Sequence, residues 1–238
     1  MCFLYLMTLW LKTKMSKKRY DLVLYDLDGT LTDSIPLIMD SFRYAYEAFP
    51  EIPPRTDDDL MSYIGKPLET SFEVHDEDTA RILLERYLDY NHKRLWDGDL
   101  DLFDGIIEAL SQIREQGVRQ GIVTAKREYA AMITIEKTGL ASIMDVYVFG
   151  DDGCRAKPAG DPVIVGASKA GIFDMSRVLY VGDAMPDIQC ARNAGCDFAF
   201  VAWSKMPEAE KEEILAMDPE FVVKEPKDLS CIIRDAEL

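Results

Sequence analysis

Short apolar runs of strand length alternate with amphipathic stretches at the start of the chain and again beyond residue 100. Alternating strands and helices are typical of a parallel sheet covered by helices on both faces. The sequence therefore predicts an α/β fold with a doubly wound parallel sheet. The predicted strands are residues 22–24, 118–124, 146–149, 178–181, 198–201 and 221–223, and the predicted helices are residues 105–116, 127–139, 163–170, 186–194 and 207–217, with a last one near residue 228.

Residues 34–100 carry only helical patterns. Pro36 suits the first turn of a helix, Thr56 and Asp59 have the spacing of a capping signal, and residues 76–96 place apolar side chains near one stripe. We interpret this segment as an α-helical cap domain inserted after the first strand. The predicted organisation is a core of residues 15–33 and 101–238, a helical cap of residues 34–100, and an N-terminal extension of residues 1–14.

The extension is predicted from an unusual start. Residues 1–11 are almost wholly apolar and are followed by several lysines. The apolar run is shorter than the about 20 residues that a spanning helix needs, and its basic residues follow it, whereas those of a secretory signal precede it. A signal-anchor is the alternative to our preferred interpretation, in which the folded unit begins after Met15 and no membrane is involved.

Composition narrows the classes of function. The 238 residues include 48% hydrophobic and 29% charged residues, as in a packed globular domain, and the net charge is −16. Such acidity argues against a nucleic-acid groove but allows a small phosphorylated metabolite whose charge a metal would hold. The five cysteines show no zinc-ligand spacing, which favours reduced thiols and a cytoplasmic location. We expect a monomer or homodimer.

The candidate chemistry begins where the first strand ends. Asp26 and Asp28 follow residues 22–24, and in an extended chain this spacing puts both carboxylates on one face. Two anions so close repel each other unless a cation lies beside them, and a hard divalent ion bound by oxygen atoms fits that need. Gly29 allows a sharp turn directly after the pair.

Three more polar residues follow other predicted strands. Thr124, Lys157 and Asp183 lie at or just beyond strand ends. Parallel sheets bind ligands beyond the carboxyl ends of their strands, so these side chains should meet Asp26 and Asp28 in one crevice. Each is ordinary by itself, but together a hydroxyl, an ammonium and carboxylates suit a metal-bound phosphoryl group.

The motifs resemble those of the haloacid dehalogenase-like superfamily of phosphotransferases. The similarity covers about residues 20–203 and rests on D-x-D-G-T-L-x-D-S at residues 26–34, F-D-G at 103–105, the strand-end Thr124, K-P at 157–158 and G-D-x-x-x-D at 182–187. Two details depart from the usual pattern. Ala125 stands where Asn or Ser is common, and Gly160 stands where K-P-x-P-D has its second proline.

The resemblance implies a covalent mechanism with Mg²⁺ as cofactor. Asp26 would be the nucleophile that forms an aspartyl-phosphate, and Asp28 the general acid and base. Mg²⁺ would be held by the Asp26 carboxylate, the backbone carbonyl of Asp28 and Asp183. Thr124 and the adjacent Ala125 would bind the phosphoryl group.

Two residues complete the implied site. Lys157 would offset the charge on Asp26 and the phosphate, and Asp187 would orient Lys157 or a metal-bound water. In the cap, the G-K-P-L string at residues 65–68 resembles phosphoglycolate phosphatases and related enzymes, and it makes Lys66 a candidate for the distal anionic group of the substrate. A solvated loop lysine is the alternative for Lys66.

The predicted function is thus a Mg²⁺-dependent, phosphoglycolate phosphatase-like phosphatase acting on a small phosphorylated metabolite. Within the same superfamily, a sugar-phosphate mutase of the β-phosphoglucomutase type, a pyrophosphatase and a nucleotidase are alternatives that these residues do not separate. A phosphoacceptor receiver domain is disfavoured, because receivers lack a helical insertion after the phosphoacceptor strand. The residues do not name the substrate.

Overall fold

The computed structural model describes residues 20–98 and 100–234, and the predicted extension of residues 1–14 lies outside them. Six strands form one sheet in the order β3-β2-β1-β4-β5-β6, and every neighbouring pair is parallel. The predicted doubly wound α/β fold is confirmed. The strands are β1 (Leu22–Tyr25), β2 (Arg119–Val123), β3 (Val146–Val148), β4 (Val178–Gly182), β5 (Asp197–Val201) and β6 (Phe221–Val223).

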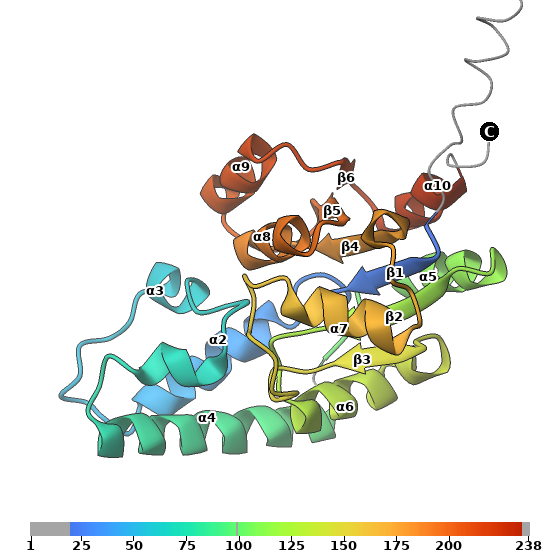
Figure 1. The fold of residues 1–238 in the computed structure, drawn as a ribbon. Coiled ribbons are helices and arrows are strands. Elements are labelled where there is room, and N and C mark those ends of the chain that lie inside the picture. Colours follow the sequence, from blue (N-terminus) through green and yellow to red (C-terminus); the bar gives the residue numbers. More distant parts are fainter. Residues whose placement is uncertain (1–19, 99, 235–238) are drawn as a thin grey trace, which may run out of the picture.

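Helices cover both faces of the sheet (Figure 1). In β1, Val23 and Tyr25 belong to the hydrophobic cluster of one face, and Leu22 and Leu24 to that of the other. This alternation is the period of two that buries both faces of a central strand. The first face is covered by α5 (Ile106–Glu115), α6 (Glu128–Lys137) and α10 (Leu229–Arg234), and the second by α7 (Asp161–Lys169), α8 (Met185–Ala194) and α9 (Glu208–Ala216).

The regular elements that the structure describes between β1 and α5 are all helices or helical turns, as the sequence predicts. It has a separate hydrophobic cluster, in which Phe42 packs against the rings of Tyr63, Phe72 and Tyr87. The inserted segment therefore has a core distinct from those of the sheet. Its elements are α2 (Ile35–Tyr46), α3 (Asp57–Met61), the 3₁₀ turn η1 (Leu68–Phe72) and α4 (Glu77–Asp97).

The two connections to this insertion run side by side. Thr32 and Leu102 form an antiparallel bridge, flanked by backbone hydrogen bonds from Asp33 to Asp101 at 2.9 Å and from Phe103 to Leu31 at 3.1 Å. The chain thus leaves and re-enters the core at one place, beside the carboxyl end of β1. No helix in residues 20–98 and 100–234 is long and apolar enough to cross a membrane.

The centre of the sheet depends on a residue without a side chain. A Cβ atom on Gly121 in β2 would lie 2.3 Å from Cγ2 and 2.8 Å from the backbone oxygen of Val146. We expect Gly121→Ala to lower the free energy of unfolding by about 1–3 kcal/mol, because a backbone atom cannot move aside cheaply. Urea unfolding measures the change.

The matched control is Gly166→Ala in α7. There the added Cβ would meet only side-chain atoms of Leu24 and Val123, at 3.1–3.4 Å, and alanine favours the helix by about 0.5–1 kcal/mol. The loss should therefore be clearly smaller than at Gly121. An equal loss of unfolding free energy at the two positions would show that glycine is not needed at residue 121 for the close approach of β3.

Candidate active site

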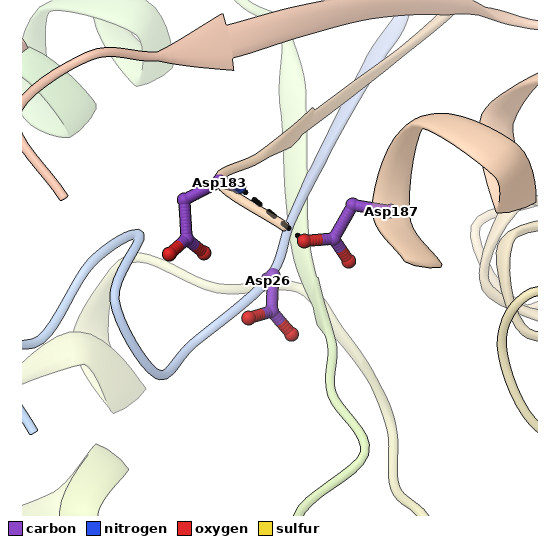
Figure 2. A group of neighbouring side chains, drawn as sticks. All are labelled: Asp26, Asp183 and Asp187. Carbon is purple, nitrogen blue, oxygen red and sulfur yellow. Dashed lines mark hydrogen bonds between the residues drawn. The ribbon is translucent and has the colours of Figure 1, made fainter. Parts of the chain in front are cut away.

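The polar residues predicted at the strand ends meet in one buried place. Asp26 ends β1, Asp183 follows β4, Asp187 lies in the first turn of α8, and Lys157 precedes α7. The Lys157 ammonium donates to Oδ1 of Asp26 at 2.6 Å and to Oδ1 of Asp187 at 2.7 Å. All three carboxylates offer an oxygen within 4.8 Å of the others (Figure 2). The predicted convergence of these side chains is thus present.

The charges of this group do not balance. Burial, and then the charge of Asp187, raises the pKa of Asp183 to about 7. Burial also raises the pKa of Asp26, against the opposing charge of Lys157. Burial alone would lower the pKa of Lys157, but the charges of Asp187 and Asp26 outweigh it and raise that pKa. When all three carboxylates are ionised, they leave two negative charges beside the one ammonium, and a divalent cation would neutralise these charges and favour the ionised forms.

The hydrogen bonds show which carboxylates could bind that cation. Asp187 is already fully used, because its oxygens accept from Lys157, from the Tyr180 hydroxyl at 2.9 Å and from the backbone N–H groups of Asp183 and Ala184. Asp26 accepts only from Lys157 among the described residues. Asp187 therefore has no lone pair left for a metal, whereas Asp26 has an oxygen left for one.

Asp183 is held firmly but with lone pairs to spare. Its Oδ1 accepts from the Thr30 hydroxyl at 2.8 Å and its Oδ2 from the Ser204 hydroxyl at 2.5 Å. A Cβ atom on Gly29 would lie 2.4 Å from Oδ2, so glycine gives this carboxylate its space. Each oxygen of an ionised carboxylate has two lone pairs, and one on each remains for a metal. The donor set therefore fits an oxygen-bound metal ion.

Asp28 and Thr124 lie beside this group. The Lys126 ammonium contacts Oδ1 and Oδ2 of Asp28 at 2.7 and 3.0 Å, and both side chains are largely buried. The Thr124 hydroxyl accepts from the backbone N–H of Lys126 at 3.1 Å and donates to no residue that the structure describes, so its proton is available to a ligand. The turn after β2 thus presents a hydroxyl and an ammonium to the carboxylates of β1.

A cavity of about 250 Å³ opens between this site and the inserted helices. Asp26, Asp28, Thr124 and Ala125 line it on the side of the sheet. Lys66 lines it from the insertion but is exposed and forms none of the contacts of the buried group. Lys66 therefore lies apart from the other predicted site residues, but it borders the same cavity.

Several contacts of the site were not predicted from the sequence. Lys126 was not among the predicted site residues, although its ammonium lies 2.7 Å from Asp28. Ser204 follows β5, so the rule that strand ends converge could have found it. Thr30 lies within the quoted D-x-D-G-T string, but nothing in that string shows that its hydroxyl reaches Asp183. Tyr180 appears in the sequence as an apolar strand residue.

The sequence model of the family described as "Haloacid dehalogenase-like hydrolase" matches residues 23–201 of this chain. The pyrophosphatase PpaX of Bacillus pumilus is 30% identical over 92% of this chain and 99% of its own. A predicted phosphatase from Clostridium acetobutylicum is similar in structure, with a TM-score of 0.77, 26% identity and coverage of 91% of this chain and 99% of that one. A predicted phosphoglycolate phosphatase from Haemophilus somnus shares the fold, with a TM-score of 0.78, 22% identity and coverage of 90% and 97%.

The buried ammonium yields a prediction about stability. Lys157→Met should lower the free energy of unfolding by about 3–5 kcal/mol, because it leaves Asp26 and Asp187 buried without their cation. Urea unfolding in the presence of a chelator measures this loss. Adding Mg²⁺ should restore part of it if the carboxylates bind metal.

Lys93→Met serves as the control. It removes the ion pair of Lys93 and Asp97, at 2.6 Å, whose side chains are 75% and 53% exposed. Exposed pairs contribute little, so the change should stay within about 0.5 kcal/mol. If Lys157→Met were equally mild, the two carboxylates would not depend on Lys157.

Proposed function

This chain belongs to the haloacid dehalogenase-like hydrolase family, and we propose that it is a Mg²⁺-dependent phosphatase of a small phosphorylated metabolite that works through an aspartyl-phosphate. The observation that supports this proposal best is the environment of Asp26. Its carboxylate is buried, it is fixed by Lys157 at 2.6 Å, and it faces a cavity that could admit a phosphate ester. A fixed carboxylate at the end of a cavity is suited to nucleophilic attack.

In the first proposed step, an oxygen of Asp26 attacks phosphorus and the bond from phosphorus to the leaving oxygen breaks. Asp28 gives a proton to that oxygen as it leaves. In the second step, Asp28 takes a proton from water, the water oxygen attacks phosphorus, and Asp26 is released. Asp28 lines the same cavity as Asp26, and Lys126 holds its side chain in place.

The remaining residues bind and orient the phosphoryl group. The free proton of the Thr124 hydroxyl would be donated to a phosphoryl oxygen, beside Ala125, and Lys157 would offset negative charge there. Mg²⁺ held by Asp26, the backbone carbonyl of Asp28 and Asp183 would neutralise charge on the phosphoryl oxygens. Asp187 would keep Lys157 in position. We further propose that residues 34–100 act as a cap over the crevice, with hinges near residues 34–36 and 100–104.

A pyrophosphatase is the second candidate, since the relative from Bacillus pumilus bears that name. Phosphoglycolate phosphatase and nucleotidase activities, and a mutase of the β-phosphoglucomutase type, use the same proposed phosphoryl-transfer residues. Phosphate release separates the hydrolases from the mutase: a hydrolase releases inorganic phosphate from its substrate, whereas a mutase returns the phosphoryl group to a sugar. The receiver-domain alternative is inconsistent with membership of this family of hydrolases.

The central test joins the nucleophile and the metal. Asp26→Asn should lower phosphate release from p-nitrophenyl phosphate by about a thousandfold or more, because an amide is a poor nucleophile. Chelation should abolish the activity of the unchanged protein, and Mg²⁺ should restore it. In Asp28→Asn, turnover should slow and a phosphoenzyme should be detectable by intact-mass spectrometry, because the attacking water has lost its base. Near-normal turnover by Asp26→Asn would rule out the covalent mechanism.

Lys66 is a proposed specificity residue. If its ammonium binds a distal anionic group, Lys66→Ala should raise KM for a substrate such as phosphoglycolate, by about tenfold, and leave p-nitrophenyl phosphate unaffected. Steady-state kinetics with both compounds measures the difference. Equal loss toward both compounds, or no loss toward either, would contradict this role.

A further inference from the structure

On the side of the insertion, much of the cavity wall is apolar. Ile38 and Phe42 of α2 line it together with Tyr63, Leu68 and Leu88. Phe42 and Tyr63 pack ring against ring, with centroids 5.3 Å apart, so this wall is fixed by the hydrophobic cluster of the insertion. A leaving group that extends from the phosphoryl site would lie against these side chains.

The cations of the cavity are occupied elsewhere. Lys126 pairs with Asp28 at 2.7 Å, and Arg127 lies 3.5 Å from Glu69 and 3.7 Å from Asp151. Among the described cations that line the cavity, the exposed Lys66 alone has no carboxylate within 4.0 Å. A second phosphate group inside the cavity would therefore meet apolar side chains and no unpaired interior cation.

Two further titratable groups of the wall, His92 and Tyr87, favour their neutral forms. Burial lowers the pKa of His92, so its imidazole is neutral near pH 7. Burial, and then the charge of Asp28, raises the pKa of Tyr87, so its phenol keeps its proton. The part of the inner surface that His92 and Tyr87 border thus combines apolar area with neutral polar groups.

Ser71 gives a second, independent sign of a ligand. It is 1% exposed, it lines the cavity, and its hydroxyl has no hydrogen-bond partner among the described residues. Buried hydroxyls are normally paired, because leaving one unpaired costs free energy. By contrast, Ser41 donates to the backbone oxygen of Leu37 at 2.7 Å and accepts from Asn91 at 3.1 Å. The unpaired hydroxyl of Ser71 is therefore available to a bound molecule.

We propose that the substrate is an organic phosphate monoester whose alcohol carries an apolar skeleton of about one ring, with a polar group within reach of Ser71, and that it is not inorganic pyrophosphate. This inference rests on the proposed phosphatase function. The cavity volume of about 250 Å³ is below the roughly 300–1,000 Å³ of sites for drug-sized ligands, which limits the skeleton to a small one. Lys66 at the exposed edge would meet any further anionic group.

The test compares esters of similar chemical reactivity. 2-Phenylethyl phosphate and 2-hydroxyethyl phosphate both release a primary alcohol, and they differ in that the first ends in a phenyl ring and the second in a hydroxyl group. We expect kcat/KM to be higher by about tenfold or more for the phenylethyl ester, as for other apolar groups placed in fitting pockets. Pyrophosphate should be a poorer substrate than the phenylethyl ester. Equal or reversed preference in either comparison would overturn the proposal.

The failure of this proposal differs from the failure of the phosphatase function. If p-nitrophenyl phosphate is hydrolysed but neither alkyl ester is, the function stands and the apolar specificity is wrong. If p-nitrophenyl phosphate, the alkyl esters and pyrophosphate are all inert with Mg²⁺ present, and no phosphoenzyme forms, then the phosphatase function is wrong and the specificity falls with it.

Leu88 and Leu84 in α4 provide a matched pair of variants. Both are half-buried in the hydrophobic cluster of the insertion and lie one helical turn apart. Of the two, only Leu88 lines the cavity. Leu88→Asn should reduce the preference for the phenylethyl ester by about fivefold or more, and Leu84→Asn should leave the preference unchanged. Because the ratio of two substrates is measured within one variant, a loss of folded protein does not alter it. Equal ratios in the two variants would overturn the assignment of this wall.

Ser71→Ala and Ser41→Ala test the hydroxyl. Replacing Ser71 should leave Tm unchanged or raise it, since no hydrogen bond of the described protein is lost. Replacing Ser41 should lower Tm, because Asn91 loses its acceptor. Equal lowering of Tm by both variants would show that Ser71 serves packing and would remove it from the proposed site.

Discussion

The structure depends on one buried ammonium between two carboxylates. Lys157 is 3% exposed on its side chain and contacts Asp26 and Asp187 at 2.6 and 2.7 Å. Removing such charges from water is costly, and the cost is offset only where geometry is good and the remaining lone pairs are satisfied. The surroundings meet this condition: Tyr180 and two backbone N–H groups contact Asp187, and a Cβ atom on Gly182 would lie 2.6 Å from the Asp187 side chain.

The sequence could predict the parts of the site that strand order alone brings together. Asp26 and Asp183 follow apolar runs directly, and β1 and β4 are neighbours with Tyr25 beside Val181, so strand order alone brings the two carboxylates together. Lys126 and Ser204 lie in turns, where hydrophobic periodicity does not determine the direction of a side chain. Leu88 fell near the predicted apolar stripe of residues 76–96, and periodicity could not show that it borders a cavity. The helices and strands themselves follow from the pattern closely, because nearly every strand is buried on both faces.

The loop of residues 203–206 connects a candidate metal ligand, Asp183, to the insertion. The Trp203 indole N–H donates to the backbone oxygen of Thr30 at 3.0 Å, the Ser204 hydroxyl donates to Asp183, and Met206 is buried in the hydrophobic cluster of the insertion. One short segment therefore contacts the turn after β1, a candidate metal ligand and the cap core. A shift of the insertion would move Met206, and through it the group that holds Asp183. This loop is a contiguous physical route from the core of the insertion to Asp183.

Similarity to known pyrophosphatases and phosphatases says more about phosphoryl transfer than about the leaving group. Phosphoryl transfer needs a fixed carboxylate, a metal site and balancing cations, and the sheet edge supplies all of the protein groups. The cavity beside that edge is bordered by Phe42 and Leu88 of the insertion, where the proposed leaving group would lie. The core cations Lys126 and Arg127 at this cavity are already paired with carboxylates. A fold and its core chemistry are shared by many activities, and specificity lies in the side chains that differ. A 30% identical relative therefore supports the reaction class, whereas the identity of the alcohol has to be argued from the cavity of this chain.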